Sequence, residues 1–530
     1  MKFKFKRPLI LLVVSIAFIW FLYITAIFIS NYLPSTSTVI YFITAWLALE
    51  ISWYIYFRTT VIHRLATFRP EDSCKSLTKK DVDLCINDIV YLLETNAARF
   101  WSNVTGINID EFSKGKKLPI ATAKSFLNSI FMIFPECTIY KESSQKLLYQ
   151  NALQRIETAS NGFDHNPTTK LMPNLIKGWY DDNHIKKIVR SSPLIVITLS
   201  YLCLSAVIIL LYSCGWKCGH YDATTGMECW ILKSSKSTNI NKPNDKKKPL
   251  VLFPGAGAGL LSFLPFLLQI QFGQRRTNQN QRDIVVYRFP WVEVGRLTYT
   301  FPQWTEIING ICKSLHVVGI DEKFDLIAHS YGTIVAGRLL RHLCSGESHR
   351  PFLCIDYLAM LDPVLLGGAS CGLISQLNHA GPDLSFGFAA NRAGIFNFEI
   401  LNYNPQLSGQ CMTGMSFYLS NDDVLVDVGL ARHILETYKT RKCPQQEQQQ
   451  CSQIKNEKQT KKVVNNAHLG TCNIELVVDT SPNSFHGRWL IDFWCINWWD
   501  RPCATKAMAM MNPFLHLVDE ETIDVQKKFQ

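Results

Sequence analysis

The chain has 530 residues, of which 47% are hydrophobic, and a formal net charge of +11. This length exceeds that of one compact domain and predicts two or three structural units. The basic residues lie beside apolar segments and form no stripe with interleaved aromatic side chains, which argues against a nucleic-acid partner and favours a membrane surface. The 17 cysteines are scattered without the paired spacing of a zinc site, so we expect neither a metal nor a cofactor.

Residues 1–60 are predicted to form a transmembrane hairpin. After the basic residues at positions 2–7, the chain runs without charge from position 8 to beyond 30, and a second apolar run extends from Val39 to Phe57, interrupted only by Glu50. Each run is long enough to cross a bilayer. Lys and Arg lie outside the hairpin and not in its turn, which predicts that both of its ends face the cytosol.

The segments that follow are predicted to be a helical region at 61–190, a third apolar segment at 191–214 and a linker at 215–248. The apolar segment contains an uncharged run from Leu194 to Tyr212, and its length favours a third membrane span. A buried or re-entrant helix is the alternative. Residues 233–248 are rich in Lys, Ser, Asn and Pro, which is typical of a linker. We therefore expect a multi-pass integral membrane protein.

One segment of the C-terminal half is typical of a nucleophile elbow. An apolar strand over 324–328 leads to Ser330, and a helical pattern over 333–343 follows at once. Ala328 and Gly332, two residues before and two after the serine, are small, as the close approach of strand and helix at such a turn requires. Ser330 is therefore the predicted nucleophile.

A glycine-rich turn follows an apolar strand at 249–259, where the sequence is PLVLFPGAGAG. In hydrolases with a nucleophile elbow, such a turn gives one backbone N–H to the oxyanion hole, and the residue after the serine gives the other. We therefore predict that the N–H groups of Ala256 and Tyr331 bind the oxyanion. A nucleotide-phosphate loop is disfavoured, because no Lys-Ser or Lys-Thr pair follows and no acidic ribose-binding residue is evident.

Three aspartates are candidates for the acid that orients the catalytic base. In this type of hydrolase the chain order is Ser, then acid, then His. Asp423 lies in an acidic loop after an apolar strand and is the predicted acid, with its neighbour Asp422 and the strand-ending Asp362 as alternatives. An aspartate in a loop is also commonly a turn or helix cap, and this alternative applies to each of the three.

The base that takes the proton of the serine is predicted to be a histidine beyond the acid. Four histidines follow Asp362, namely His379, His433, His468 and His486. His433 lies within a helical pattern, and His468 borders a polar insertion. His486 lies in a loop between the last apolar run, at 474–478, and a helix. This is where the general base belongs, and we predict His486.

Taken together, these motifs resemble the α/β-hydrolase superfamily. The motifs are FPGAGAG at 253–259, AHSYG at 328–332, LDPV at 361–364, LSNDD at 419–423 and FHG at 485–487. Pro254-Gly255 stands where the family usually has His-Gly, and Ala328 where it usually has Gly. Neither departure removes a catalytic group. The layout of the whole chain resembles that of membrane-anchored serine hydrolases of lower eukaryotes.

The resemblance implies an α/β-hydrolase fold, a mostly parallel sheet flanked by helices, over residues 249–500. A Gln- and Lys-rich insertion at 443–466 is predicted to be a flexible loop between acid and base, and 501–530 to be a C-terminal tail. The implied activity is hydrolysis of carboxylic esters through an acyl-enzyme. Apolar residues after the oxyanion turn and the proximity of a membrane favour lipid-like ester substrates.

Three other functions follow less well from the sequence. An acyltransferase would use the same triad with an alcohol in place of water, and the sequence does not separate the two. A catalytically silent hydrolase fold could serve as a membrane scaffold, but such a protein has no need to keep serine, acid and histidine in order. A transporter or channel is disfavoured, because the apolar segments contain no membrane-embedded cluster of charges.

Overall fold

The computed structural model of the chain describes several separate stretches. Apart from Gly106 and Ala258, they are residues 36–61, 79–131, 143–166, 193–234, 248–277, 282–293, 302–344, 353–364, 412–423 and, with shorter gaps, 426–436, 473–492 and 503–511. Several predicted features lie outside the described residues: the first apolar segment at 8–30, the insertion at 443–466, and His379, His433, His468 and His486.

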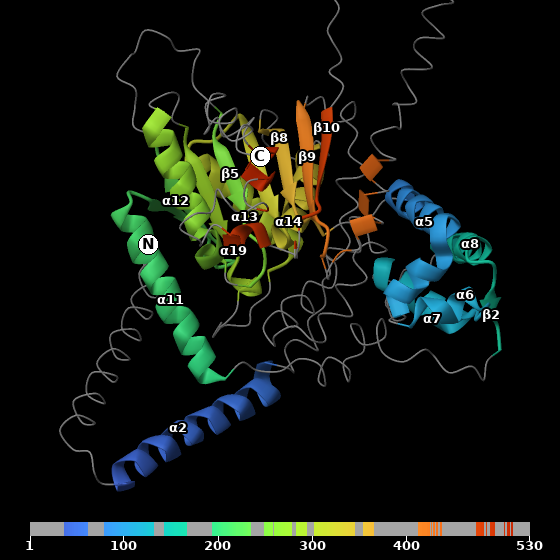
Figure 1. Ribbon diagram of the computed structural model, residues 1–530, viewed down its shortest axis with the longest axis horizontal. Coiled ribbons are helices and arrows are strands. Elements are labelled where there is room, and N and C mark those ends of the chain that lie inside the picture. The colour runs from blue at the N-terminus through green and yellow to red at the C-terminus, as the bar shows by residue number, and fades with distance from the viewer. Residues whose placement is uncertain are drawn as a thin grey trace, which may run out of the picture.

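An eight-stranded sheet forms the centre of the C-terminal half (Figure 1). Its strands, in the order in which they lie side by side, are β10 (Asn473–Asp479), β9 (Gly414–Ser420), β8 (Cys354–Leu361), β7 (Lys323–His329), β5 (Leu250–Phe253), β6 (Ile284–Arg288), β4 (Glu228–Leu232) and β3 (Lys217–Tyr221). From β10 to β6 all neighbours are parallel, whereas β4 pairs antiparallel with both β6 and β3. This mostly parallel sheet confirms the predicted α/β class of the C-terminal half.

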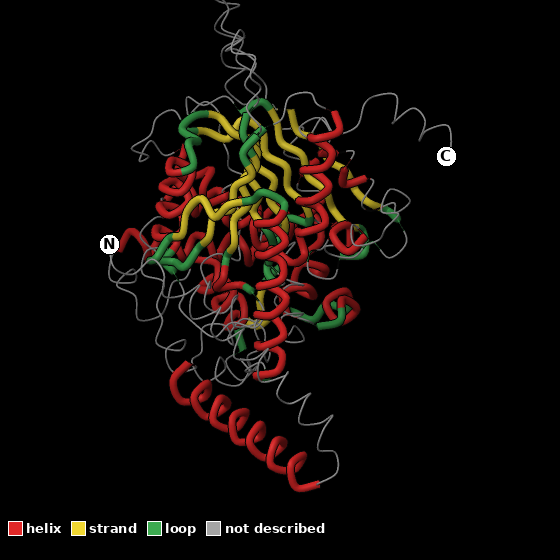
Figure 2. The backbone as a smooth tube through the Cα atoms, turned by 90° about the vertical axis from the view of Figure 1, so that its left-hand side faces the viewer, coloured by secondary structure: helices red, strands yellow, loops and turns green. Residues whose placement is uncertain are grey.

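Helices cover both faces of this sheet (Figure 2). They include α12 (Leu260–Thr277), α13 (Trp304–Val317), α14 (Tyr331–Cys344) and the short α19 (Arg488–Asp492), with a 3-10 turn η4 (Pro290–Val292). Side chains alternate along a strand, so Val251 and Phe253 enter the core beneath α13 and α14, while Leu250 and Leu252 enter the core beneath α12. All four are fully buried, as a strand covered on both faces requires.

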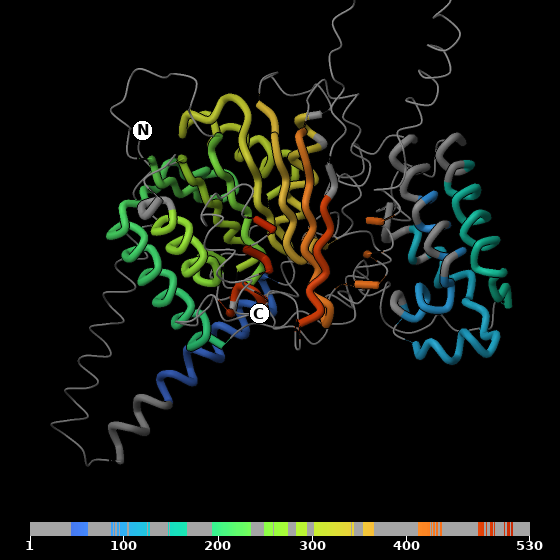
Figure 3. Tube along the Cα trace, turned by 45° about the horizontal axis from the view of Figure 1, so that its top comes forward, coloured from blue at the N-terminus to red at the C-terminus, as the bar shows by residue number. Residues whose placement is uncertain are grey.

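The N-terminal half contains a separate helical body, which lies beside the β10 edge of the sheet (Figures 1 and 3). Its elements are α5 (Lys79–Thr105), α6 (Ile109–Ser113), α7 (Ile120–Phe131) and α8 (Ser143–Ala159), with two short strands, β1 (Leu118–Pro119) and β2 (Phe163–Asp164). Edge-to-face contacts among Phe100, Trp101 and Phe126 fill its core. The Trp101 Nε1 donates to Ser160 Oγ at 3.0 Å, which ties α5 to the end of α8.

Two further apolar helices are α11 (Leu194–Ser213), which packs on α12, and α2 (Thr36–Tyr56), which contacts α11 and continues as a short π-helix η1 (Phe57–Val61). Among the described residues, α11 is the one helix that is long and apolar enough to cross a membrane. Only Ile197, Val207 and Leu211 of α11 are buried. The other side chains of this helix, most of them apolar, are half-buried or exposed.

Two predicted boundaries are wrong. Residues 217–232, assigned to a linker, form β3 and β4, and Trp230 is buried between the sheet and α11. Within 501–530, assigned to a tail, Cys503 and the apolar residues at 507–511 that the structure describes are buried in the core beneath α12. Both segments are short and mixed in composition, so their burial comes from long-range pairing that local patterns do not reveal.

Candidate functional site

Ser330 stands at the turn where β7 ends and α14 begins. Its φ is 49°, in the left-handed region that side chains other than glycine rarely adopt. The Ser330 N–H donates to Leu361 O of the neighbouring strand at 3.0 Å, and its carbonyl accepts from the N–H of Thr333 at 2.9 Å and from the Thr333 hydroxyl at 2.6 Å. These bonds hold the strained turn, and such strain is concentrated at functional sites.

Gly332 allows the elbow to pack against the strand beside it. A Cβ at this position would overlap the backbone oxygen of Phe253 and lie 2.8 Å from that of Pro254. Ala328, by contrast, stands at the usual Gly position of the pattern and fits, since its methyl group is fully buried in the core on the face of the sheet that α13 and α14 cover. The elbow therefore requires glycine after the serine and tolerates alanine before it.

We expect Gly332→Ala to lower the free energy of unfolding by about 3 kcal/mol, because backbone atoms cannot yield as flexible side chains do. Gly115 supplies the control, since its φ is 88° and a Cβ added there would meet no atom within 4 Å. Gly115→Ala should cost only the backbone strain, about 1 kcal/mol. Urea unfolding of both variants measures the difference. Equal losses in the free energy of unfolding would show that the overlap with Phe253 does not destabilise the Gly332→Ala variant.

The predicted oxyanion turn lies directly against the elbow. β5 pairs in parallel with β7, with Phe253 opposite Ala328, so the turn that follows β5 meets the residues that follow β7. A Cβ on Gly255 would lie 3.0 Å from the Cβ of Ser330 and 2.7 Å from Nδ1 of His329. Ala256 is half-buried, and Tyr331 is fully buried. The backbone of the turn can therefore approach a group bound at Ser330.

A buried cluster of charges supports the far side of this turn. Arg288 at the end of β6 donates through Nε to both carboxylate oxygens of Glu293, at 3.0 and 2.8 Å, and through Nη1 to Glu228 Oε1 at 2.7 Å. Burial alone lowers the pKa of Arg288, but the two carboxylates outweigh it and hold that pKa above its usual value. The guanidinium is therefore permanently charged.

Glu293 also contacts the turn itself. The Gly257 N–H donates to Val292 O at 2.9 Å, and Gly257 pairs with Glu293 in a short bridge. A Cβ on Gly259, which has a φ of 52°, would overlap the Glu293 carboxyl group. The carboxylate thus fills the space beneath the glycines. Sequence reasoning missed this cluster, although the arginine and the glutamate five residues later both flank the Phe-Pro-Trp segment.

The three candidate acids have different environments. Asp423 is half-buried at the end of β9, and its Oδ1 accepts from the N–H of Val426 at 3.1 Å. Asp422 is exposed. Asp362 is fully buried with a φ of 45°, and its Oδ1 accepts from the N–H of Ser420 at 3.0 Å. Its Oδ2 lies 4.0 Å from Nε2 of His329. Asp362 thus joins the ends of β8 and β9 beside the elbow.

The segments before and after the undescribed 485–487 are fixed at two parts of the site. On one side, the Ser484 carbonyl accepts from the N–H of Asp422 at 2.9 Å, and its hydroxyl accepts from the N–H of Asn421 at 3.0 Å. On the other, the ring of Trp489 lies 5.4 Å from that of His329, the residue before Ser330. Ser484 therefore lies at the acidic turn, and Trp489 lies beside the elbow.

A second buried network, which the sequence did not predict, surrounds the end of β10. Asp479 at the end of β10 accepts from Lys506 Nζ at 2.8 Å, from the N–H of Ser481 at 2.9 Å and from the Tyr418 hydroxyl at 2.6 Å. Burial alone raises the pKa of Asp479, but these hydrogen bonds outweigh it and keep that pKa below its usual value. Lys506 lies in the predicted tail, so no local pattern marked it.

No metal site accompanies these residues in the part of the chain that the structure describes, where no group of three or more His, Cys, Asp or Glu side chains is placed to hold an ion. The elbow, the glycine-rich turn and the acidic turn lie together at the carboxyl ends of β7, β5 and β9. At this edge of a parallel sheet, loops from different strands converge on one ligand.

Comparisons with known proteins give matches in structure only. No family model and no curated protein sequence matches the chain. Among solved structures, it is similar to a membrane phospholipase A described as a bacterial virulence factor, with 13% identity, 60% of this chain and 93% of that chain covered, and a TM-score of 0.32. It is also similar to naproxen esterase from Bacillus subtilis, with 13% identity, 59% of this chain and 97% of that chain covered, and a TM-score of 0.29. A third is the esterase Pf2001 from Pyrococcus furiosus, with 12% identity, 57% of this chain and 95% of that chain covered, and a TM-score of 0.33.

Proposed function

We propose that the protein is a membrane-anchored serine hydrolase that cleaves carboxylic, lipid-like esters through an acyl-enzyme. Ser330 attacks the acyl carbonyl while His486 takes its proton, and Asp423 holds the imidazole in the required tautomer. The N–H groups of Ala256 and Tyr331 bind the oxyanion. His486 then protonates the leaving alcohol, and water, activated by the same histidine, releases the acid.

The observation that carries the proposal is the backbone at Ser330. A serine with a φ of 49° between a buried parallel strand and a helix, with a glycine-rich turn within contact of its Cβ, has no evident structural purpose. A glycine at this position would remove the strain at lower cost. The strain is explained if the hydroxyl must stand at the apex of the turn, open to a substrate.

The contacts of Ser484 and Trp489, the described residues on either side of 485–487, support His486 as the base. Ser484 is bound to the acidic turn, and Trp489 packs beside His329. In our proposal His486, which lies in the sequence between these two residues, pairs with Asp423 and takes the proton of Ser330. Asp362 and Asp422 are the alternative acids, and the burial of Asp362 beside His329 favours a role for it in holding the elbow.

We extend the proposal to integral, multi-pass membrane association. The apolar segment at 8–30 and α2 supply the predicted hairpin, and α11 presents an uncharged apolar surface to the same medium. Ester substrates dissolved in a bilayer would then be available at high local concentration. No nucleic acid and no cofactor enters this proposal.

Labelling with a fluorophosphonate tests the nucleophile directly, because this probe forms a stable bond only with an activated serine. We expect the detergent-extracted protein to be labelled and Ser330→Ala to be unlabelled. Ser113→Ala, at an exposed serine of α6, should be labelled as the unchanged protein is. No labelling of folded protein would favour the silent scaffold. If labelling succeeds, the split of product between acid and ester in the presence of glycerol separates hydrolysis from acyl transfer.

A further inference from the structure

The direction of α11 relative to the candidate site follows from its contacts with α12. Helix α12 begins at Leu260, immediately after the glycine-rich turn, and runs toward the amino ends of the strands. Its Gln271, more than halfway along, donates through Nε2 to Cys214 O at 2.6 Å and accepts from Trp216 Nε1 at 2.9 Å. The carboxyl end of α11 is therefore fixed far from the site, and its amino end points toward the edge that carries Ser330.

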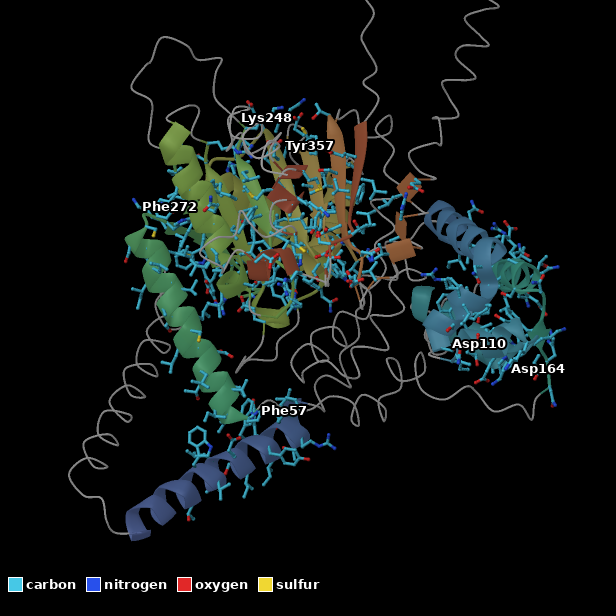
Figure 4. All side chains as sticks on the ribbon, viewed as in Figure 1. Phe57, Asp110, Asp164, Lys248, Phe272 and Tyr357 are labelled. Atoms are coloured by element: carbon cyan, nitrogen blue, oxygen red, sulfur yellow. The ribbon has the colours of Figure 1, made fainter. Side chains whose placement is uncertain are left out.

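The pictures agree with this arrangement. Figure 4 labels Lys248, just before β5, and Tyr357, in the first half of β8, at the top of the sheet, and it labels Phe57, at the end of α2, below the sheet. In Figure 1 the lower part of α11 extends past the bottom edge of the sheet to α2. The strands run from top to bottom, so the carboxyl edge of the sheet faces the side on which α2 lies.

A single carboxylate joins α2 to the amino end of α11. Glu50 accepts from the N–H groups of Leu194 and Ile195, at 3.0 and 3.4 Å. The first N–H groups of a helix have no partner within the helix and carry a partial positive charge, so a carboxylate there is stabilising. The one charge that interrupts the apolar run of α2 is thus used to hold the two helices together.

Apolar side chains are exposed on the described parts of both helices. On α2, Leu47, Leu49, Ile51, Tyr54, Ile55 and Tyr56 are 43–59% exposed. These positions fall on two opposite faces of the helix, so one protein partner packed against one side could not cover them all. On the amino-terminal half of α11, Ile195 and Leu199 are 50% and 53% exposed. A medium that surrounds a helix, such as lipid, matches this pattern.

We propose that α2 and the amino-terminal half of α11 enter a lipid bilayer, and that the carboxyl edge of the sheet faces the bilayer surface. The substrate ester is then a lipid that reaches Ser330 from the membrane; this last point rests on the proposed ester hydrolysis, whereas the orientation rests only on the proposed membrane association. The carboxyl-terminal half of α11 stays outside, because Val207 and Leu211 pack into the core beneath α12. Trp53, Tyr54 and Arg58 near the end of α2 are of the types that concentrate at a bilayer interface.

Photo-crosslinking tests the orientation without any need for activity. The full chain with Ser330→Ala is reconstituted in radiolabelled phosphatidylcholine vesicles with a benzophenone amino acid in place of one exposed side chain. We expect lipid adducts when the benzophenone replaces Ile51 or Leu199. We expect no adducts at Phe272 and Val317, which lie away from α2, are 46% and 53% exposed and serve as matched controls. Ile209, 65% exposed on the carboxyl-terminal half of α11, should also give none.

Two outcomes would overturn the proposal. Equal lipid adducts at Ile209 and Leu199 would mean that α11 crosses the whole bilayer and that the sheet is not oriented as proposed. Adducts to a second copy of the chain at Ile51 or Leu199 would mean that these helices form a protein interface.

The substrate claim has its own test in the active protein. Leu199→Glu should lower turnover of a bilayer-embedded fluorogenic ester about tenfold relative to turnover of a short soluble ester, because a charge is unfavourable in the bilayer. Val317→Glu should leave the ratio unchanged. If the wild-type protein hydrolyses neither ester but gives the expected crosslinking pattern, the proposed function is rejected and the proposed orientation is retained. An unchanged ratio in Leu199→Glu would reject delivery of the substrate from the membrane.

Discussion

Replacement of His486 by Ala should lower kcat for a soluble ester by about 10⁴-fold or more, because the Ser330 hydroxyl is a weak nucleophile without a base. Ser330→Ala should have a similar effect, and the double variant should be no slower than either single variant, since the two groups act as one unit. His316→Ala is the control. His316 is exposed, and its Nδ1 lies 2.5 Å from Oδ1 of Asp321, on the surface of the protein. Additive losses, or retained turnover in His486→Ala, would contradict the assignment.

The same assay separates the candidate acids. Asp423→Asn should lower kcat by about 10⁴-fold, because the amide favours the wrong tautomer of the histidine. Asp362→Asn should act chiefly on stability, since the carboxylate of Asp362 is fully buried and accepts from the N–H of Ser420. A kcat loss in Asp362→Asn as large as that in His486→Ala, with Asp423→Asn active, would transfer the role of the acid to Asp362.

The parts of the candidate site that the sequence predicts most directly are those with a local signature. An elbow needs small residues two positions before and after the serine, and an oxyanion turn needs glycines after a buried strand. Ser330 and the turn at 253–259 can therefore each be predicted from a short segment of the sequence. The sheet brings them together because β5 and β7 are parallel neighbours. The order of the strands, and not the motif, produces that proximity.

The parts that sequence reasoning missed depend on distant partners. β3 has the sequence KCGHY, which alternates poorly and resembles a polar linker, yet it forms an antiparallel edge with β4. Lys506 lies in a stretch without strong periodicity, and only the fold brings its ammonium to Asp479. Neither contact changes the local composition. Edge strands and buried ion pairs are stabilised by what they meet, which one sequence does not reveal.

The buried cluster beneath the glycine-rich turn leads to the second large effect. Glu293→Gln keeps the size of the side chain and leaves Arg288 paired with Glu228, but it removes the charge that binds the guanidinium on both carboxylate oxygens. Because Glu293 fills the space beneath Gly259 and bridges to Gly257, we expect the turn to shift and the Ala256 N–H to lose its alignment with the oxyanion. Loss of one such donor costs about 10²-fold in kcat.

A matched variant distinguishes positioning of the turn from simple loss of stability. Arg282 and Asp325 form another buried ion pair, at 2.6 Å, at the amino end of the sheet and away from the turn. Breaking either pair should lower the free energy of unfolding by about 3 kcal/mol. Only Glu293→Gln should also lower kcat while KM stays nearly constant, since the effect arises in the transition state. If Glu293→Gln and Asp325→Asn lose equal stability and both retain the wild-type kcat, the cluster stabilises the fold and does not position the oxyanion donor.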